Sequence, residues 1–299
     1  MSSPLLHRRA LGAVAVIAVT GLVAVSCGSS DSNAEGKTTS TTAAAKSRPT
    51  VTIEAADFSF TAPATIPAGY VDVTLKNIGQ EGHQAAFVKL NGVSETDFTT
   101  AASNTDIGSL GKAVFVGGPN GADPGGSATA TVKLDPGSYE IVCFIPGSDG
   151  KAHAAHGMIS KVEVKQTAAS VETAPKSDGT IGLSDFVFEP PKGFTGKGTF
   201  TVENQGSEVH ELALFKIADG KTIDDVKGFL LAPPGTPPPV GPPPFTSAGG
   251  VVGLSAKAKA WLTLDLAPGK YAMLCFFPDP KKDNLPHALE GMIKEITVA

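Results

Sequence analysis

The chain repeats itself, and this duplication constrains its fold more than any other feature of the sequence. Residues 51 to 165 match residues 179 to 298 at both ends and in the middle. The motif DFSF near the start of the first unit returns as DFVF in the second, and LDPGSYEIVCFIP, which ends at Pro146, returns as LAPGKYAMLCFFP, which ends at Pro278. Self-similarity of this kind means that one structural unit is used twice. A fold assigned to the first unit therefore applies to the second.

Each unit contains short runs rich in β-branched and aromatic residues, such as YVDVTLKN and GTFTVEN, separated by Pro, Gly and Asn turns. Apolar residues alternate with polar ones at Val132 and Leu134, which is typical of a strand with one buried face. About seven such strands per unit predict an all-β chain of two tandem antiparallel β-sandwiches. Short helices are expected only near residues 95–102 and 223–230.

The domain boundaries follow from the same pattern. The first sandwich is expected over residues 50–165 and the second over residues 179–299. Between them, residues 166–178 are rich in Ala, Ser, Thr and Lys and lack apolar periodicity, which predicts a flexible linker. A Pro-rich stretch, residues 232–245, has no Pro-rich counterpart in the first unit and is expected to be an extended spacer or a docking surface.

The first 26 residues have the pattern of a signal peptide. Basic residues at positions 8 and 9 precede an apolar run that ends at Val25, and a small residue, Ser26, follows. The run is short for a bilayer span. The segment AVSC ending at Cys27 resembles a bacterial lipobox, which implies a lipidated Cys27 anchored to the outer face of the cell membrane. The alternative is a secreted protein in which Cys27 has no such role.

Residues 27–49 are expected to be a flexible tether, because their Ser, Thr and Ala content cannot bury enough apolar surface to fold. The formal net charge is −5, and the body of the chain has no Lys/Arg cluster. The charge pattern of a nucleic-acid-binding protein is therefore absent.

Most of the soft or borderline metal ligands beyond Cys27 occupy equivalent positions in the two units. In chain order, they are His83, Cys143, His153 and Met158 in the first unit and His210, Cys275, His287 and Met292 in the second. Two imidazoles, a thiolate and a thioether form the ligand set of a blue-copper centre, in which a weak axial Met completes a trigonal His₂Cys site. His156 and Met273 have no histidine or methionine at the equivalent position of the other unit. His156 aligns with Glu290, and both are expected to be exposed loop side chains.

These units resemble the cupredoxins, the superfamily of plastocyanin and azurin. The resemblance rests on the N-x-G turn before the first His, the Cys that ends a strand after PGxY, and the His and Met on the next loop. It implies a Greek-key sandwich with one copper ion per domain. The sequence departs from the family between Cys and His, where it has nine residues after Cys143 and eleven after Cys275. Longer loops can still close, since their entropic cost grows only logarithmically.

Several alternatives remain open at the level of sequence. A lone Cys is often a small buried hydrophobe, and in an oxidising compartment Cys143 and Cys275 could form a disulfide. The leading hypothesis is a copper-binding protein for one-electron transfer or copper holding, not an enzyme, with a redox partner that the sequence does not identify. A metal-free recognition module is the second hypothesis. A multicopper oxidase is disfavoured because neither Cys has an adjacent His and no His-x-His pair occurs.

Overall fold

The structure, a computed structural model, describes residues 47–110, 112–231 and 241–299. The all-β prediction is confirmed, and two short helices lie where the sequence indicated. The elements of the first repeat are β1 (Thr50–Ala56), β2 (Ser59–Thr61), β3 (Thr65–Pro67), β4 (Gly69–Asn77), β5 (Ala86–Lys89), α1 (Glu95–Ser103), η1 (Ile107–Leu110), β6 (Val114–Phe115), β7 (Ser127–Leu134), β8 (Gly137–Val142), η2 (His153–His156) and β9 (Ile159–Lys165).

The second repeat follows a similar order with one additional hairpin. Its elements are β10 (Gly179–Ser184), β11 (Val187–Glu189), β12 (Lys197–Asn204), β13 (His210–Ile217), α2 (Ile223–Leu230), β14 (Phe245–Leu254), β15 (Lys259–Asp265), β16 (Gly269–Leu274), β17 (Pro278–Asp279), β18 (Leu285–Pro286), η3 (His287–Glu290) and β19 (Ile293–Val298).

Strand β4 illustrates why these sequences form sandwiches. Val71, Val73 and Leu75 are fully buried, whereas the residues between them are more exposed. Side chains alternate between the two faces of a strand, so this pattern places the apolar groups on one face. Burying each such side chain contributes about 1.5–3 kcal/mol. On the opposite sheet, Phe87 and Ile141 belong to the same core.

Each repeat contributes strands to two main sheets, and the second repeat also has the two-stranded sheet β17–β18. In the first, β2, β1, β4 and β7 form one sheet, and β3, β9, β8, β5 and β6 form the other. In the second, β11, β10, β12 and β15 form one sheet, and β14, β13, β16 and β19 the other. The sequence predicted antiparallel pairing, and this was wrong for three pairs of strands. Strand β1 runs parallel to β4, β10 to β12, and β3 to β9. In the first repeat, the chain visits the opposite sheet at β3 before returning at β4.

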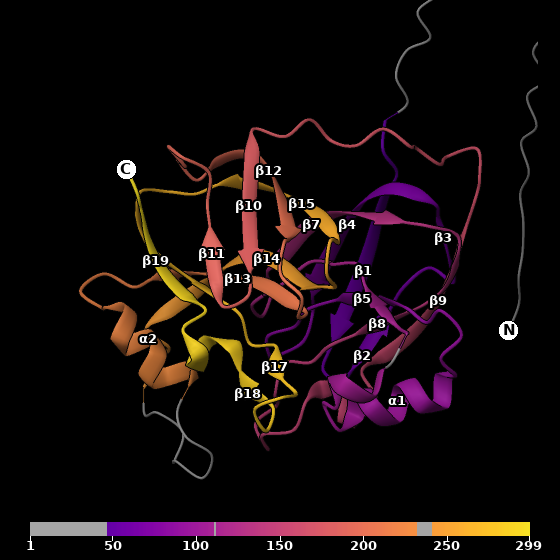
Figure 1. Ribbon diagram of the computed structural model, residues 1–299, viewed down its shortest axis with the longest axis horizontal. Coiled ribbons are helices and arrows are strands. Elements are labelled where there is room, and N and C mark those ends of the chain that lie inside the picture. Colours follow the sequence, from indigo (N-terminus) through magenta and orange to yellow (C-terminus); the bar gives the residue numbers. More distant parts are fainter. Residues whose placement is uncertain (1–46, 111, 232–240) are drawn as a thin grey trace, which may run out of the picture. The chain divides into compact units, whose positions relative to one another are not determined.

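The two repeats share one sheet and one core. Strand β15 pairs with β7 at Ala260–Val132 and Trp261–Thr131, so the sheet continues from β11 to β2 across both repeats (Figure 1). One hydrophobic cluster contains buried residues of both repeats. The connecting segment, residues 166–178, also contacts the first repeat, since the carbonyl of Val171 accepts a hydrogen bond from the Tyr70 N–H at 2.7 Å. Composition suggested a flexible linker and gave no sign of these contacts.

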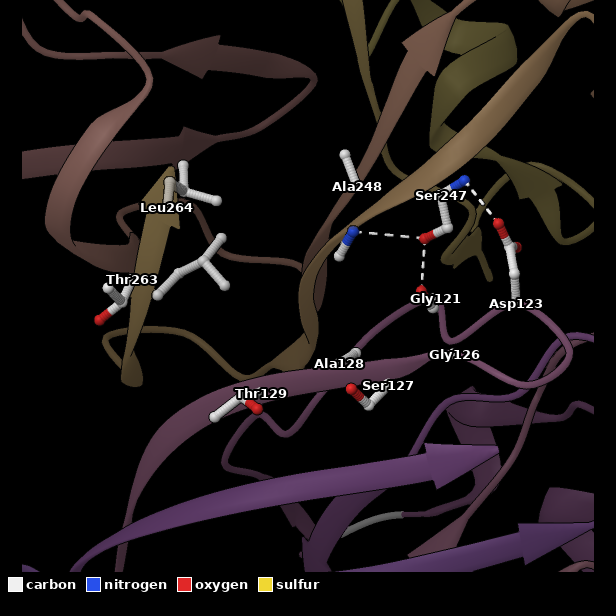
Figure 2. A pocket seen from close by; sticks show the side chains of 12 residues that line it. Gly121, Asp123, Gly126, Ser127, Ala128, Thr129, Ser247, Ala248, Thr263 and Leu264 are labelled. Carbon is white, nitrogen blue, oxygen red and sulfur yellow. Dashed lines mark hydrogen bonds between the residues drawn. The ribbon is translucent and has the colours of Figure 1, made fainter. Parts of the chain in front are cut away.

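A second contact joins the residues before β7 to strand β14. Pro119 pairs with Val251 across the interface, and the sequence repeat makes these two positions equivalent. The contact is thus self-complementary, like the interface of a two-fold dimer. Near this contact, the Ser247 N–H donates to Asp123 Oδ2 at 3.0 Å and the Ser247 hydroxyl donates to the Gly121 carbonyl (Figure 2).

Some sequence predictions lie outside the described residues. These are the leader, Cys27, most of the tether and residues 232–240 of the Pro-rich stretch. Within the described ranges, no helix combines the length and apolar composition needed to cross a membrane.

Gly118, which precedes Pro119 at this interface, allows a test of the local backbone packing. Its φ is +145°, and an added Cβ would lie 1.9 Å from the Ala85 carbonyl oxygen. Gly125 also has positive φ, +74°, but a Cβ there would meet open space. We expect Gly118→Ala to lower the free energy of unfolding by at least about 2 kcal/mol more than Gly125→Ala, because only the first adds a clash to the backbone strain. Chemical denaturation of both variants measures the difference, and equal losses would contradict the close approach.

Candidate metal centres

An asparagine holds the loop that carries the first histidine of each repeat. In the first repeat, Asn77 Nδ2 donates to the carbonyls of Glu81 and Ala122 at 2.7 and 2.8 Å, and its Oδ1 accepts the Gly79 N–H. In the second, the same three bonds join Asn204 to Glu208, Leu254 and Gly206. Both asparagines are buried, and their bonds satisfy backbone groups that a turn leaves unpaired. This accounts for the N-x-G turn six residues before each histidine.

Backbone hydrogen bonds close the cysteine and second-histidine loop in the first repeat. Cys143 lies one residue beyond β8. Its carbonyl accepts the Ala154 N–H at 2.9 Å, and its N–H donates to the Met158 carbonyl at 3.2 Å. The His153 N–H donates to the Ile145 carbonyl at 2.9 Å. These bonds bring the backbones of the cysteine, the second histidine and the methionine together.

The second repeat closes in the same way despite its longer loop. The Cys275 carbonyl accepts the Ala288 N–H at 2.8 Å, and the Cys275 N–H donates to the Met292 carbonyl at 3.3 Å. The longer loop forms the small hairpin β17–β18, which precedes His287. The departure from the cupredoxin spacing is therefore absorbed in the loop and does not disturb the Cys–His–Met backbone arrangement.

The structure brings together two histidines and one cysteine in each repeat. In the first, His83 Nδ1 lies 3.2 Å from His153 Nδ1, and Cys143 Sγ lies 3.4 Å from His153 Nδ1. In the second, the Nδ1 atoms of the two histidines are 3.0 Å apart, and the cysteine Sγ lies 4.0 and 3.5 Å from them. In each group, the three ligand atoms lie within 4.8 Å of one another. All six side chains are fully buried; the second group is His210, Cys275 and His287.

Carboxylates hold the outer nitrogens of three of the four rings. The pairs are Asp57 Oδ1 with His83 Nε2 at 3.3 Å, Glu81 Oε2 with His153 Nε2 at 2.8 Å, and Asp185 Oδ1 with His210 Nε2 at 2.9 Å. Such carboxylate–histidine pairs fix the tautomer and the orientation of a metal ligand. Asp57 and Asp185 are the first residues of the repeated DFSF and DFVF motifs, to which no role was assigned from sequence. The repetition of this aspartate in both units is the signal that could have indicated its role.

These partners determine where the imidazole lone pairs point. A neutral imidazole that donates from Nε2 carries its lone pair on Nδ1. In the first repeat, two such lone pairs therefore face each other at 3.2 Å in a fully buried position. Burial lowers the pKa of His83, and the nearby His153 lowers it further. A cation bound between the two nitrogens would relieve this arrangement, which is why the donor set fits a metal ion.

The thiols complete this donor set. Both cysteines are free, so the structure does not contain the Cys143–Cys275 disulfide that the sequence left open. Burial raises the pKa of the Cys143 thiol to about 12 and raises the pKa of Cys275 as well. Metal binding must therefore displace a proton from each thiol. Met158 and Met292 are fully buried, and their backbone carbonyls bond to the two cysteine N–H groups.

The two centres differ at the second histidine. His287 Nε2 is buried and has no hydrogen-bond partner among the described residues, whereas His153 Nε2 faces Glu81. Glu208, the residue equivalent to Glu81, instead pairs with Lys281. Burial lowers the pKa of His287 to about 4, and the adjacent histidine contributes to the shift. Equivalent sequence positions thus have different hydrogen bonding.

The expectation that Glu290 is exposed was wrong. Its side chain is only 4% exposed and pairs with Lys282. The sequence repeat did not indicate this burial, because the ion-pair partner Lys282 lies in the loop that is longer in the second repeat. The side chain of His156, its counterpart, is 32% exposed and lies 3.2 Å from Asp149, and it is not part of the donor cluster.

An aromatic ring packs against each second histidine. Phe58 packs edge-on against His153 with ring centroids 5.2 Å apart, and Phe186 packs against His287 at 5.0 Å. Both phenylalanines have positive φ, +63° and +67°, a conformation that costs about 1–3 kcal/mol for a bulky residue. The same strain in both repeats, beside the same ligand, indicates that the turn serves to place this ring.

Comparison with known proteins gives matches only among solved structures. No protein-family model and no curated protein matches the chain. Dithionite-reduced auracyanin from Roseiflexus castenholzii is 23% identical, with a TM-score of 0.30, over 40% of this chain and 98% of that chain. Auracyanin A, described as a "blue" copper protein from Chloroflexus aurantiacus, is 15% identical, with a TM-score of 0.30, over 40% and 100%. An azurin from Methylomonas sp. strain J is 14% identical, with a TM-score of 0.29, over 40% and 100%.

The chain itself has two sandwiches, and each contains a buried His–Cys–His group. Each repeat is a cupredoxin-like domain.

The orientation of the rings can be tested without metal. In metal-free protein at pH 8, we expect His83 and His153 to be Nε2–H tautomers, because their Nε2 atoms face carboxylates. His210 should also be an Nε2–H tautomer, whereas His287 should carry its proton on Nδ1 and donate to His210, since its Nε2 lacks an acceptor among the described residues. Long-range ¹H–¹⁵N NMR distinguishes the tautomers. A proton on Nδ1 of His83 or His153 would contradict the facing lone pairs.

Proposed function

We propose that each cupredoxin-like domain binds one copper ion and that the protein serves as a one-electron carrier or copper-holding protein. The observation that carries this proposal is the pair of buried Nδ1 atoms that face each other beside a thiol in both domains. The proposed ligands are His83, Cys143 and His153 in the first domain and His210, Cys275 and His287 in the second, with Met158 and Met292 as weak axial ligands.

The donor chemistry favours copper over other metals. Thiolate and thioether suit Cu(I), and imidazole serves both Cu(I) and Cu(II). Copper would supply reversible one-electron chemistry at this position. The chain contributes a buried, preformed donor set whose rings are oriented by Asp57, Glu81 and Asp185. Little rearrangement is then needed between oxidation states.

A carrier is favoured over an oxidase by the histidine inventory. Two donor groups of this kind are found within the described residues, one in each domain. His156, which lies outside both groups, pairs with Asp149. No His stands beside Cys143 or Cys275 in the sequence to serve a catalytic copper site. We therefore propose a binding protein and not an enzyme, acting with an unidentified redox partner.

We further propose that the protein acts outside the cytoplasm, anchored to the cell membrane by a lipid on Cys27. The signal-peptide pattern and the lipobox-like AVSC support this location. The tether of residues 27–49 would then connect the copper-binding domains to the membrane.

Copper loading tests the main proposal. We expect two copper ions per chain and, in the oxidised form, strong visible absorption from Cu(II)–thiolate bonding. Cys143→Ser should remove one copper and Cys275→Ser the other, because each domain carries its own thiol. Metal analysis and absorption spectra of the wild type and both variants provide the measurement.

The matched control is Met273→Leu, which alters a buried methionine that has no counterpart in the first repeat. It should keep both coppers. Reconstituted protein that stays copper-free, with both thiols titratable, would refute copper binding and favour a metal-free recognition module.

The anchor has a separate test. Cys27→Ala should move the protein from the membrane to the soluble fraction of fractionated cells, because the variant lacks the acyl-bearing residue. Ser26→Ala, which keeps the cysteine, should remain with the membrane. Membrane retention of Cys27→Ala would show that the anchor lies elsewhere.

A further inference from the structure

Glu211 links the ligands of the second site to one another. It follows His210 directly, and it is only 3% exposed. Its backbone N–H donates to Cys275 Sγ at 3.4 Å, and its Oε1 accepts the N–H of Phe276 at 3.0 Å. One residue thus bonds the cysteine sulfur, holds the backbone just after the cysteine, and adjoins the first histidine. A displacement of Glu211 would disturb both ligands.

The other oxygen of this carboxylate is held from the first domain. Asn120 is 4% exposed, and its Nδ2 donates to Glu211 Oε2 at 3.1 Å and to the Leu212 carbonyl at 3.4 Å. The backbone N–H of Asn120 in turn donates to the Gly250 carbonyl at 3.3 Å, which anchors it at the interface. Among the described residues, the donors to the Glu211 carboxylate are Phe276 and Asn120.

The hydrogen bond from Asn120 of the first domain to Glu211 of the second has no counterpart from the second domain to the first. The residue that follows His83 in the first domain is Gln84, which has no charge, and the position equivalent to Asn120 in the second domain is Val252, which has no side-chain donor. The backbone contacts of the interface are nearly two-fold symmetric. The buried contact between Asn120 and Glu211 breaks this symmetry, because the equivalent positions carry Val252 and Gln84. The first site therefore has no contact equivalent to the hydrogen bond between Asn120 and Glu211.

We propose that Asn120 is a positioning residue for the second metal site, so that the first domain completes the site of the second. Asn120 acts through Glu211: it fixes the carboxylate, which fixes the backbone around Cys275. This proposal rests on the proposed function only in that the bound metal is copper. The tandem arrangement then has a consequence that two independent domains would not give, since the second site depends on docking of the first domain.

An isosteric exchange tests the proposal. Asn120→Asp keeps the volume but replaces the amide donor with a second carboxyl group. Two carboxyl groups in buried contact do not both ionise, so the variant must take up a proton or lose the contact. Adding Glu211→Gln restores the bond between the two side chains in the reverse direction, because the introduced amide donates to the introduced carboxylate. The longer bond from Asn120 to the Leu212 carbonyl is not restored, because a carboxylate has no donor. The amide oxygen can still accept the Phe276 N–H. The second site is measured in a Cys143→Ser background and the first site in a Cys275→Ser background.

We expect Asn120→Asp to weaken copper binding at the second site by roughly 10- to 100-fold, the usual effect of losing a partner that orients a ligand. Its Cu(II)–thiolate absorption should also shift. The first site should keep its affinity and spectrum. The double exchange with Glu211→Gln should restore most of the affinity and the spectrum of the second site.

A metal-free measurement separates this proposal from the proposed function. In copper-free protein, Asn120→Asp should raise the rate at which a disulfide reagent modifies Cys275 and leave the rate for Cys143 unchanged. If the parent protein binds no copper, the proposed function fails, but the two thiol rates still decide the role of Asn120. Equal effects on both thiols, no effect on Cys275, or no recovery in the double exchange would overturn the proposal.

Discussion

The feature on which the rest of the site depends is the hydrogen bond between a buried imidazole and a carboxylate. Asp57 and Glu81 accept hydrogen bonds from the Nε2 atoms of the two histidine rings in the first domain. The Nδ1 atoms of these rings then face each other beside Cys143. A buried polar group that lacks a partner is costly. The first domain holds this arrangement because the loops that carry the ligands are tied by backbone hydrogen bonds to a closely packed sandwich.

The two domains have the same scaffold but not the same site. Glu81 orients His153, whereas Glu208 pairs with Lys281 and leaves the equivalent ring without this partner. Glu211 replaces the neutral Gln84 beside the first histidine and brings a carboxyl group into the interface. Outer partners of this kind tune ligand basicity and metal affinity. The two centres therefore have different surroundings.

The interface itself explains how one side can support the other. Backbone pairing of Pro119 with Val251, and of β7 with β15, gives a contact that needs few particular side chains. Glycine at position 118 and at the equivalent position 250 lets these segments pass close to neighbouring backbone. The two repeats differ at both ends of one contact in this nearly symmetric interface, because Asn120 and Glu211 stand where the equivalent positions carry Val252 and Gln84. The shared sheet and core join the two domains directly.

The sequence by itself determined the duplication, the strand-rich fold, the two helices and the identity of the eight candidate ligands. These follow from local pattern: alternation reports a buried face, and repeated His, Cys and Met stand out because they are rare. Tertiary structure alone decided which groups orient the rings, that β7 and β15 join, that Glu290 is buried, and that Asn120 reaches Glu211. Most of these contacts join residues far apart in the chain, and their formation depends on packing geometry, which no local pattern encodes.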